Sequence, residues 1–82
     1  MTADEPVADL ELDCRGLLCP RPVIELAQRI ADIELGQTVA VAATDAAAAY
    51  DIPAWCRMRG QEYVGVAPAP DGVPRYLVRR LT

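Results

Sequence analysis

The chain has 82 residues and a formal net charge of −4, with eight arginines and no lysine or histidine. A chain of this length forms one domain, and its acidic balance argues against tight, nonspecific binding to nucleic acid, which requires a net basic face. The absent side chains exclude lysine Schiff-base chemistry, histidine-ligated zinc sites and cysteine hydrolases with a histidine base. The three cysteines, Cys14, Cys19 and Cys56, lack the two close pairs of a structural zinc site, so no metal and no cofactor are expected.

The first nine residues are acidic and polar, where a secretory signal would be basic and then apolar. Residues 1–9 are therefore predicted to form a short disordered tail before a single domain at residues 10–82. The longest weakly polar stretch, residues 39–50, contains Asp45 and is too short to span a bilayer. An odd cysteine count without a signal indicates a reducing compartment, so we expect a cytoplasmic protein without membrane contact.

Residues 10–13 alternate apolar and acidic side chains, which predicts a strand with one face on a core. A helix is predicted from Pro22 onward. Its apolar stripe consists of Val23, Leu26, Ala27, Ile30 and Ile33. Gly36 is placed to end this helix as a left-handed C-cap.

Cys19 stands immediately before the expected start of this helix. Proline is favoured in the first helical turn because its missing N–H would have no intrahelical partner, so Pro20 and Pro22 place Cys19 at or beside the N-cap. The positive end of the helix dipole then biases the thiol toward a moderately activated thiolate. Arg15 and Arg21 add to this bias if their guanidinium groups point inward. The alternative is an ordinary buried cysteine.

Residues 38–44 are small or β-branched, which predicts a buried strand. Asp45 and Asp51 each offer an N-cap for a second helix. Because proline is unfavourable well inside a helix, Pro53 favours a start near Asp51, after a turn or short helical piece. This helix is expected to end at Gly60.

Residues 63–67 and 75–81 are predicted strands, joined by a loop at residues 68–74 that contains proline and glycine. The element order is then β-α-β-α-β-β. We therefore predict an α+β fold, a two-layer α/β sandwich in which a four-stranded mixed sheet carries two helices on one face. The first two strands should run parallel, and the last two should form a hairpin.

Short motifs along nearly the whole domain resemble those of the TusA/SirA-type sulfur carrier family. The most specific is the family's Cys-Pro-x-Pro signature, which stands here as Cys19-Pro20-Arg21-Pro22. The other matching segments are Leu12-Asp13, Gly16-Leu17, Ala43-Thr44-Asp45, Asp51-Ile52-Pro53-Ala54-Trp55-Cys56, Gly60, Asp71-Gly72-Val73-Pro74 and Tyr76-Leu77-Val78-Arg79. Their order on both sides of the signature makes the resemblance strong.

The resemblance implies a small carrier that accepts sulfane sulfur as a persulfide on Cys19. Relatives take the sulfur from a cysteine desulfurase or a rhodanese-like donor and pass it to an acceptor protein, in tRNA thiolation, molybdenum cofactor biosynthesis or sulfur oxidation. Such a carrier is a protein co-substrate of sulfurtransferase reactions and needs no general base. By position, Arg21 and Asp45 fall where relatives meet their partners. Two departures, Gln61 for a histidine and Ala46 for a proline, leave the sulfur site unchanged.

The thiolate and the helix start are expected to depend on Arg15, Gly16, Pro20, Arg21 and Pro22. Cys14 is interpreted as a core residue on the first strand, with a role as a resolving thiol for Cys19 as the alternative. Cys56 and Trp55 are expected in the core. Asp45 is interpreted as a helix cap, with partner contact as a secondary role.

Five arginines in the second half of the chain are candidates for a basic patch. They are Arg57, Arg59, Arg75, Arg79 and Arg80. A solvated face with local ion pairs is the favoured interpretation. A patch would instead suit an acidic protein partner or transient contact with tRNA.

Two functions from different classes fit these residues. The favoured one is a sulfur-relay protein that carries a persulfide on Cys19. The other is a noncatalytic regulatory or redox-sensing module, whose redox form would make a Cys14–Cys19 disulfide under mild oxidation. A small carrier that docks to several partners needs no oligomer, so a monomer is expected.

Overall fold

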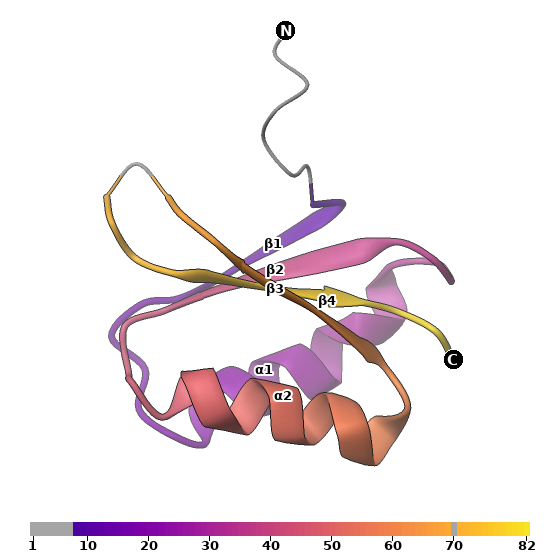
Figure 1. Cartoon of the computed structure of the whole chain (residues 1–82), viewed down its shortest axis with the longest axis horizontal. Helices are drawn as coiled ribbons and strands as arrows, with labels where there is room; N and C mark the ends of the chain where they lie inside the picture. Colours follow the sequence, from indigo (N-terminus) through magenta and orange to yellow (C-terminus); the bar gives the residue numbers. More distant parts are fainter. Residues whose placement is uncertain (1–7, 70) are drawn as a thin grey trace, which may run out of the picture.

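The computed structural model describes residues 8–69 and 71–82. Two helices cover one face of a four-stranded sheet (Figure 1). The elements in chain order are β1 (Leu10–Cys14), α1 (Arg21–Arg29), the short 3-10 helix η1 (Ile30–Asp32), β2 (Thr38–Ala43), α2 (Ala48–Arg59), β3 (Glu62–Ala67) and β4 (Arg75–Arg79). The predicted two-layer α+β fold is confirmed.

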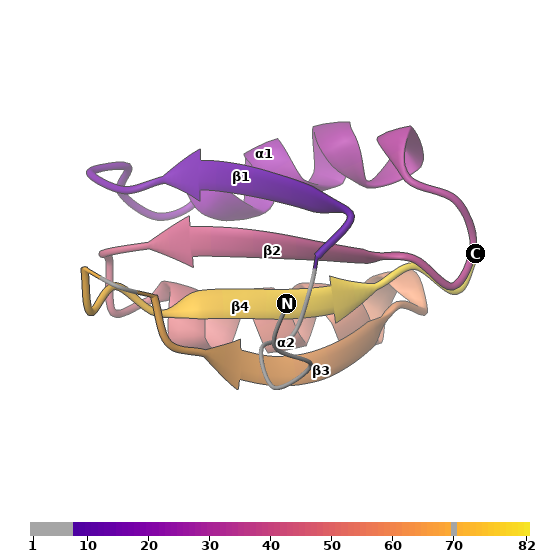
Figure 2. The ribbon, with the colours of Figure 1, turned by 90° about the horizontal axis from the view of Figure 1, so that it is seen from above.

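The strands lie side by side in the order β1-β2-β4-β3 (Figure 2). β1 pairs in parallel with β2, with Cys14 opposite Ala43, while β4 pairs antiparallel with both β2 and β3. The predicted parallel pair and the predicted hairpin are both confirmed. Because β1 and β2 are parallel, their carboxyl ends meet at one edge of the sheet, where the loops that follow them also meet.

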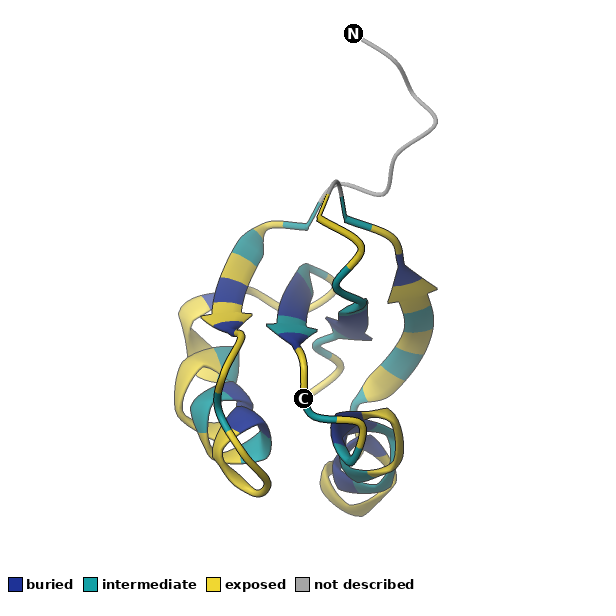
Figure 3. Cartoon of the chain, turned by 90° about the vertical axis from the view of Figure 1, so that its left-hand side faces the viewer, coloured by how far each residue is buried: buried dark blue, intermediate teal, exposed yellow. Residues whose placement is uncertain are grey.

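The core lies between the sheet and the helices, because alternate residues of each strand point to that side. The buried parts of both helices turn toward the sheet (Figure 3). The largest fully buried side chains are Leu26, Ile52, Val39, Val41, Val78, Cys14 and Cys56. Trp55 is buried as well, so Cys14, Trp55 and Cys56 are core residues, as predicted.

The apolar stripe of α1 packs on the sheet with one exception. Leu26 and Ile33 are buried, and Val23 and Ile30 pack against the same core, but Ala27 is exposed. A methyl side chain is too short to reach the sheet from the rim of the stripe. The prediction that Ala27 belongs to the buried stripe is therefore wrong.

The end of α1 also differs from its prediction. The helix stops at Arg29, η1 follows, and Ile33 is already extended, so Gly36 does not cap a helix. Gly36 instead has a left-handed backbone, with φ 86°, in the turn before β2. Its N–H donates a 2.7 Å hydrogen bond to the Arg80 carbonyl, which ties this turn to the chain after β4. The left-handed backbone at Gly36 therefore belongs to a turn and not to a helix end.

Helix α2 begins at Ala48, earlier than the predicted start near Asp51. The Asp45 carbonyl accepts the N–H of Ala48 at 3.0 Å, so a helical turn forms before Asp51 is reached. The N-cap position belongs to Ala47, and neither aspartate occupies it. The expected start near Asp51 is therefore wrong.

Pro53 lies inside α2. Its missing N–H leaves the carbonyl of Ala49 without the usual helical donor, and Ala49 is exposed, so water can take the donor's place. The helix ends at Gly60 in a left-handed conformation with φ 71°, as predicted.

The sheet face away from the helices has a small apolar floor formed by Ala40, Ala67 and Leu77, against which Ala8 packs. Asp9, next to Ala8, is bound to the first residue of β2. Its N–H donates to the Thr38 carbonyl at 2.8 Å, and its carboxylate accepts the Thr38 N–H at 2.9 Å. Of the predicted tail at residues 1–9, residues 1–7 lie outside the described residues.

Candidate functional site: Cys19 between two carboxylates

Cys19 is exposed in the loop between β1 and α1. Pro20 is the N-cap of α1 and Pro22 is buried in its first turn, so both prolines lie where the helix starts. Gly16 shapes the same loop through its left-handed backbone, with φ 81°. Its N–H donates to Oγ1 of Thr44 at 2.9 Å, which joins the loop after β1 to the loop after β2.

The amide groups around Cys19 already have acceptors. The Cys19 N–H donates to Oδ2 of Asp45 at 2.7 Å, and the Arg21 N–H donates to the Leu18 carbonyl at 2.8 Å. Neither of these two amides is therefore free to donate a hydrogen bond to the sulfur. Without them, the start of α1 stabilises an anion at Sγ less than a bare helix end would.

Asp51 is the side chain that meets the sulfur. The Cys19 thiol donates a 2.8 Å hydrogen bond from Sγ to Oδ2 of Asp51, across the space between the α1 loop and α2. This hydrogen bond, together with partial desolvation of the sulfur and the negative charges of Asp51 and Asp45, raises the pKa of the Cys19 thiol above its usual value. The expected activation toward thiolate is therefore wrong for the free protein.

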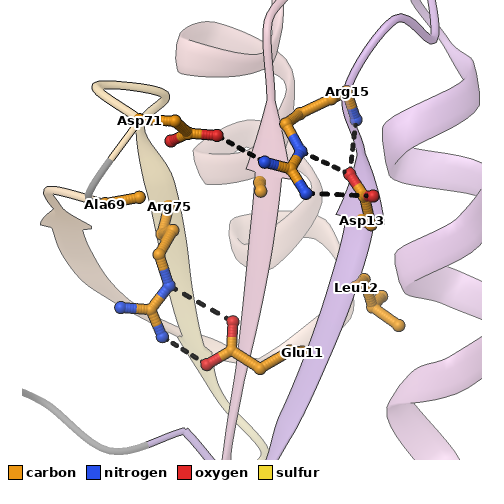
Figure 4. A pocket seen from close by; sticks show the side chains of 8 residues that line it. Glu11, Leu12, Asp13, Arg15, Ala69, Asp71 and Arg75 are labelled. Atoms are coloured by element: carbon orange, nitrogen blue, oxygen red, sulfur yellow. Dashed lines mark hydrogen bonds and ion pairs between the residues drawn. The ribbon is translucent and has the colours of Figure 1, made fainter.

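Arg15 does not support the thiolate either. Its Nε donates to Oδ1 of Asp13 at 2.8 Å, and its Nη1 pairs with Asp71, which lies in the loop between β3 and β4. Figure 4 shows the guanidinium held between these two carboxylates. Arg21 is exposed at the start of α1, and in residues 8–69 and 71–82 it forms no ion pair.

Asp45 connects the two loops at the carboxyl edge of the sheet. One carboxylate oxygen accepts the Cys19 N–H, and the other accepts the Ala47 N–H at 3.0 Å. Both hydrogen bonds favour the ionised form, so the pKa of Asp45 lies below its usual value. Asp45 thus orders the turn before α2 and holds the backbone of Cys19 at the same time.

An apolar groove of about 240 Å³ adjoins the thiol. Its lining comes from the start of α1 and from one side of α2, and consists of Cys19, Pro20, Val23, Asp51, Ala54, Trp55 and Met58. Two large apolar side chains near it, Leu18 and Met58, are more than 70% exposed, at 72% and 78%. The sulfur therefore lies at the edge of a surface that is apolar and open to solvent.

The other two cysteines are sealed in the core, each 1% exposed. Burial raises the pKa of the Cys14 thiol and raises that of Cys56 to about 11. The described residues contain no cluster of three or more potential metal ligands. Cys19 is thus the one cysteine of the three that is exposed to solvent.

The opposite face of the sheet has a second pocket of about 370 Å³, rimmed by ion pairs. Arg75 pairs with Glu11 there, and Arg15 pairs with Asp13 and Asp71 (Figure 4). Arg79 pairs with Glu62 at 2.9 Å on the neighbouring strands. Arg80 donates to the Ile33 carbonyl at 2.5 Å. For Arg75, Arg79 and Arg80, local ion pairs and hydrogen bonds are the better description, as predicted.

The role of Asp51 was not predicted from the sequence, where it is only a candidate helix cap. One signal was available: two aspartates follow the second strand of a parallel pair, and the cysteine loop follows the first. Loops at the carboxyl ends of neighbouring parallel strands meet at the same edge of the sheet. The topology therefore brings Asp45 and Asp51 to Cys19.

The sequence matches the profile of the family described as Sulfurtransferase TusA over residues 10–80. A sulfur carrier protein TusA of Pseudomonas syringae pv. syringae (strain B728a) is 40% identical over 72 residues, which cover 88% of this chain and 84% of the relative. A putative sulfur carrier protein of Archaeoglobus fulgidus is 38% identical over 69 residues, which cover 84% of this chain and 90% of the relative.

A third relative is longer. The putative sulfur carrier protein YrkF of Bacillus subtilis (strain 168) is 33% identical over 73 residues, or 89% of this chain, and the match spans 39% of YrkF. The chain therefore corresponds to well under half of that relative. Because the family profile extends from the start of β1 to just past β4, the chain belongs to the TusA family.

Proposed function

We propose that this protein carries sulfane sulfur as a persulfide on Cys19 between a donor and an acceptor protein. The observation that carries the proposal is the contrast among the cysteines: Cys19 is exposed beside a groove, while Cys14 and Cys56 are buried. The family, and the relatives named as sulfur carrier proteins, support the same role.

The transfer needs no oxidant and no histidine. The Cys19 sulfur, as thiolate, attacks the outer sulfur of a donor persulfide, one S–S bond forms and the donor's S–S bond breaks. The electron pair of the broken bond leaves with the donor sulfur, which takes up the proton lost by Cys19. In the second step an acceptor thiolate attacks the outer sulfur on Cys19, and Cys19 leaves as the thiolate.

A cysteine desulfurase or a rhodanese-like protein fits the donor role, and a second thiol protein fits the acceptor role. Downstream use in tRNA thiolation, molybdenum cofactor biosynthesis or sulfur metabolism belongs to this proposal, as does a cytoplasmic location. Exposed Arg21 and half-buried Asp45 remain the proposed partner contacts, because both flank Cys19 at the carboxyl edge of the sheet. In the described residues, no helix is long and apolar enough to cross a membrane.

The redox-sensing alternative is less favoured by the geometry. A disulfide requires both sulfurs to meet, and Cys14 is 1% exposed on the helix-covered face of β1. Bridging it to Cys19 would require Cys14 to leave the core, at the cost of its packing. Peptide mapping without reductant after mild oxidation tests this alternative directly, because only the redox sensor needs the bridge.

The test of the carrier is intact-mass spectrometry after incubation with a cysteine desulfurase and cysteine. Wild type is expected to gain one sulfur, and Cys19→Ser is expected to gain none. Cys56→Ser is the matched control and should load like wild type. Loading of Cys19→Ser would overturn the assignment, and so would the absence of loading with both a desulfurase and a rhodanese supplied with thiosulfate.

A further inference from the structure

The Asp51 carboxylate has a specific geometric relation to the sulfur. Asp51 lies on α2. The core fixes the orientation of this helix, because Ile52, next to Asp51, is fully buried and Trp55, one turn later, is buried as well. This packing sets the rotation of the helix and directs Asp51 to the groove wall that it shares with Cys19. The result is the 2.8 Å hydrogen bond from Sγ to Oδ2.

The fold itself does not require this carboxylate. In the described part of the chain, Asp51 accepts no hydrogen bond other than the one from Sγ and forms no ion pair. The N-cap position of α2 belongs to Ala47, so Asp51 is not needed to start the helix. The remaining role for the Asp51 carboxylate is its interaction with the Cys19 sulfur.

The charges facing Sγ are negative. Asp51 lies on α2 and Asp45 lies in the loop after β2, and both act on Cys19. The nearest cations in sequence do not offset them, because Arg15 is paired with Asp13 and Asp71, and Arg21 contacts neither carboxylate among the residues described. An anion on the cysteine sulfur therefore meets like charge.

We propose that Asp51 favours the empty carrier over the loaded one and so promotes release of the sulfur. In the empty form its carboxylate accepts the hydrogen bond from the Cys19 thiol. In the loaded form the outer sulfur of a persulfide, which is more acidic than a thiol, is an anion that the same carboxylate repels. The inference rests on the proposed carrier function.

The reaction that Asp51 biases is an exchange in which Cys19 persulfide and a thiol give Cys19 thiol and the persulfide of the acceptor. One S–S bond breaks and one forms, with no net oxidation, so the position of equilibrium depends on how each form is stabilised. Removing the Asp51 charge removes the favourable contact in the empty form and the unfavourable contact in the loaded form. Both changes shift the equilibrium toward the loaded carrier.

The first test is independent of any carrier activity. The rate of Cys19 alkylation by iodoacetamide is measured against pH for wild type and Asp51→Asn, with Glu34→Gln as a control that removes one charge beyond the far end of α1. Asp51→Asn should shift the midpoint of the curve of alkylation rate against pH to lower pH. It should also speed alkylation at neutral pH by about threefold, which is the effect expected for one exposed charge. Glu34→Gln should match wild type. An Asp51→Asn midpoint equal to or above that of wild type overturns the inference.

The second test measures the loaded form. Each variant is equilibrated with a mixture of glutathione and glutathione persulfide, and the loaded fraction is read by intact mass. Asp51→Asn should have a higher ratio of loaded to empty protein than wild type, by at least the same factor of about three. An equal or lower ratio overturns the inference about Asp51. Failure of wild type itself to load would overturn the proposed carrier function, so the two failures are distinguishable.

Discussion

Asp45 holds the backbone of Cys19 in place, because its Oδ2 accepts the Cys19 N–H at 2.7 Å. The other carboxylate oxygen accepts the N–H of Ala47 ahead of α2. The loop that carries the sulfur and the turn that starts the second helix are therefore joined through one side chain. A partner that contacts Asp45 would act on the same side chain that positions the cysteine.

The Asp45 hydrogen bonds should make stability depend on pH. The pKa of this carboxyl is lower in the folded protein, so its stabilisation is fully present above its unfolded pKa and is lost as pH falls through the folded value. Asp45→Asn should therefore lower the melting temperature at neutral pH, and the difference from wild type should shrink below about pH 4. Thermal unfolding by circular dichroism at several pH values measures this. A difference that stays constant with pH would show that the charge of Asp45 is not involved.

The three cysteines should differ sharply in reactivity. Cys14 and Cys56 are 1% exposed and burial raises the pKa of each, whereas Cys19 is exposed. Iodoacetamide under native conditions should modify Cys19 alone, and all three should react in strong denaturant. Peptide mass spectrometry gives the sites. Native modification of Cys14 at a rate near that of Cys19 would contradict the packing.

Gly16 should tolerate no ordinary side chain without strain. Its φ of 81° is unfavourable for other residues, although no atom lies within 4 Å of where a Cβ would stand. The cost of Gly16→Ala is therefore one of backbone conformation, about 1–2 kcal/mol of unfolding free energy. Urea titration measures it. Gly16→Asn, which adopts this conformation more readily, should lose less, and an equal loss in both variants would place the cause elsewhere.

Leu26 should be the main contact of α1 with the core. It is completely buried, so Leu26→Ala should lower the unfolding free energy by about 3 kcal/mol. Ile24, on the same helix, is 40% exposed, and Ile24→Ala should change the unfolding free energy by roughly 0.5 kcal/mol or less. Denaturant unfolding of both variants makes the comparison. Similar losses would show that α1 is rotated relative to the sheet.

The sequence predicts the elements well where periodicity is strong. The strand at residues 10–13, the buried strand at residues 38–44 and the final hairpin all appear with small changes at their ends. The helix ends are less predictable, because they depend on tertiary contacts. Gly36 turns the chain toward Arg80, a partner that local sequence does not reveal.

The position of Cys19 beside the start of α1 is predictable from the sequence, but the electrostatics around its sulfur are not. Cys19 and the two prolines that start α1 follow from local rules, because each acts through its own backbone. The effect of Asp51 depends on the rotation of a helix in another part of the chain, which core packing sets. For the same reason the Cys19 sulfur is less anionic than the helix dipole alone predicts, because the fold brings two carboxylates to it.

The exposed position of Cys19 has a consequence for recognition. A sulfur atom added to Sγ enters solvent or the open groove, and it displaces no side chain of the interior. The empty and loaded proteins would then share one shape nearly everywhere. A partner that must distinguish the empty from the loaded protein can do so only by reaching the cysteine itself. The contacts that distinguish the two forms must therefore lie next to that sulfur atom.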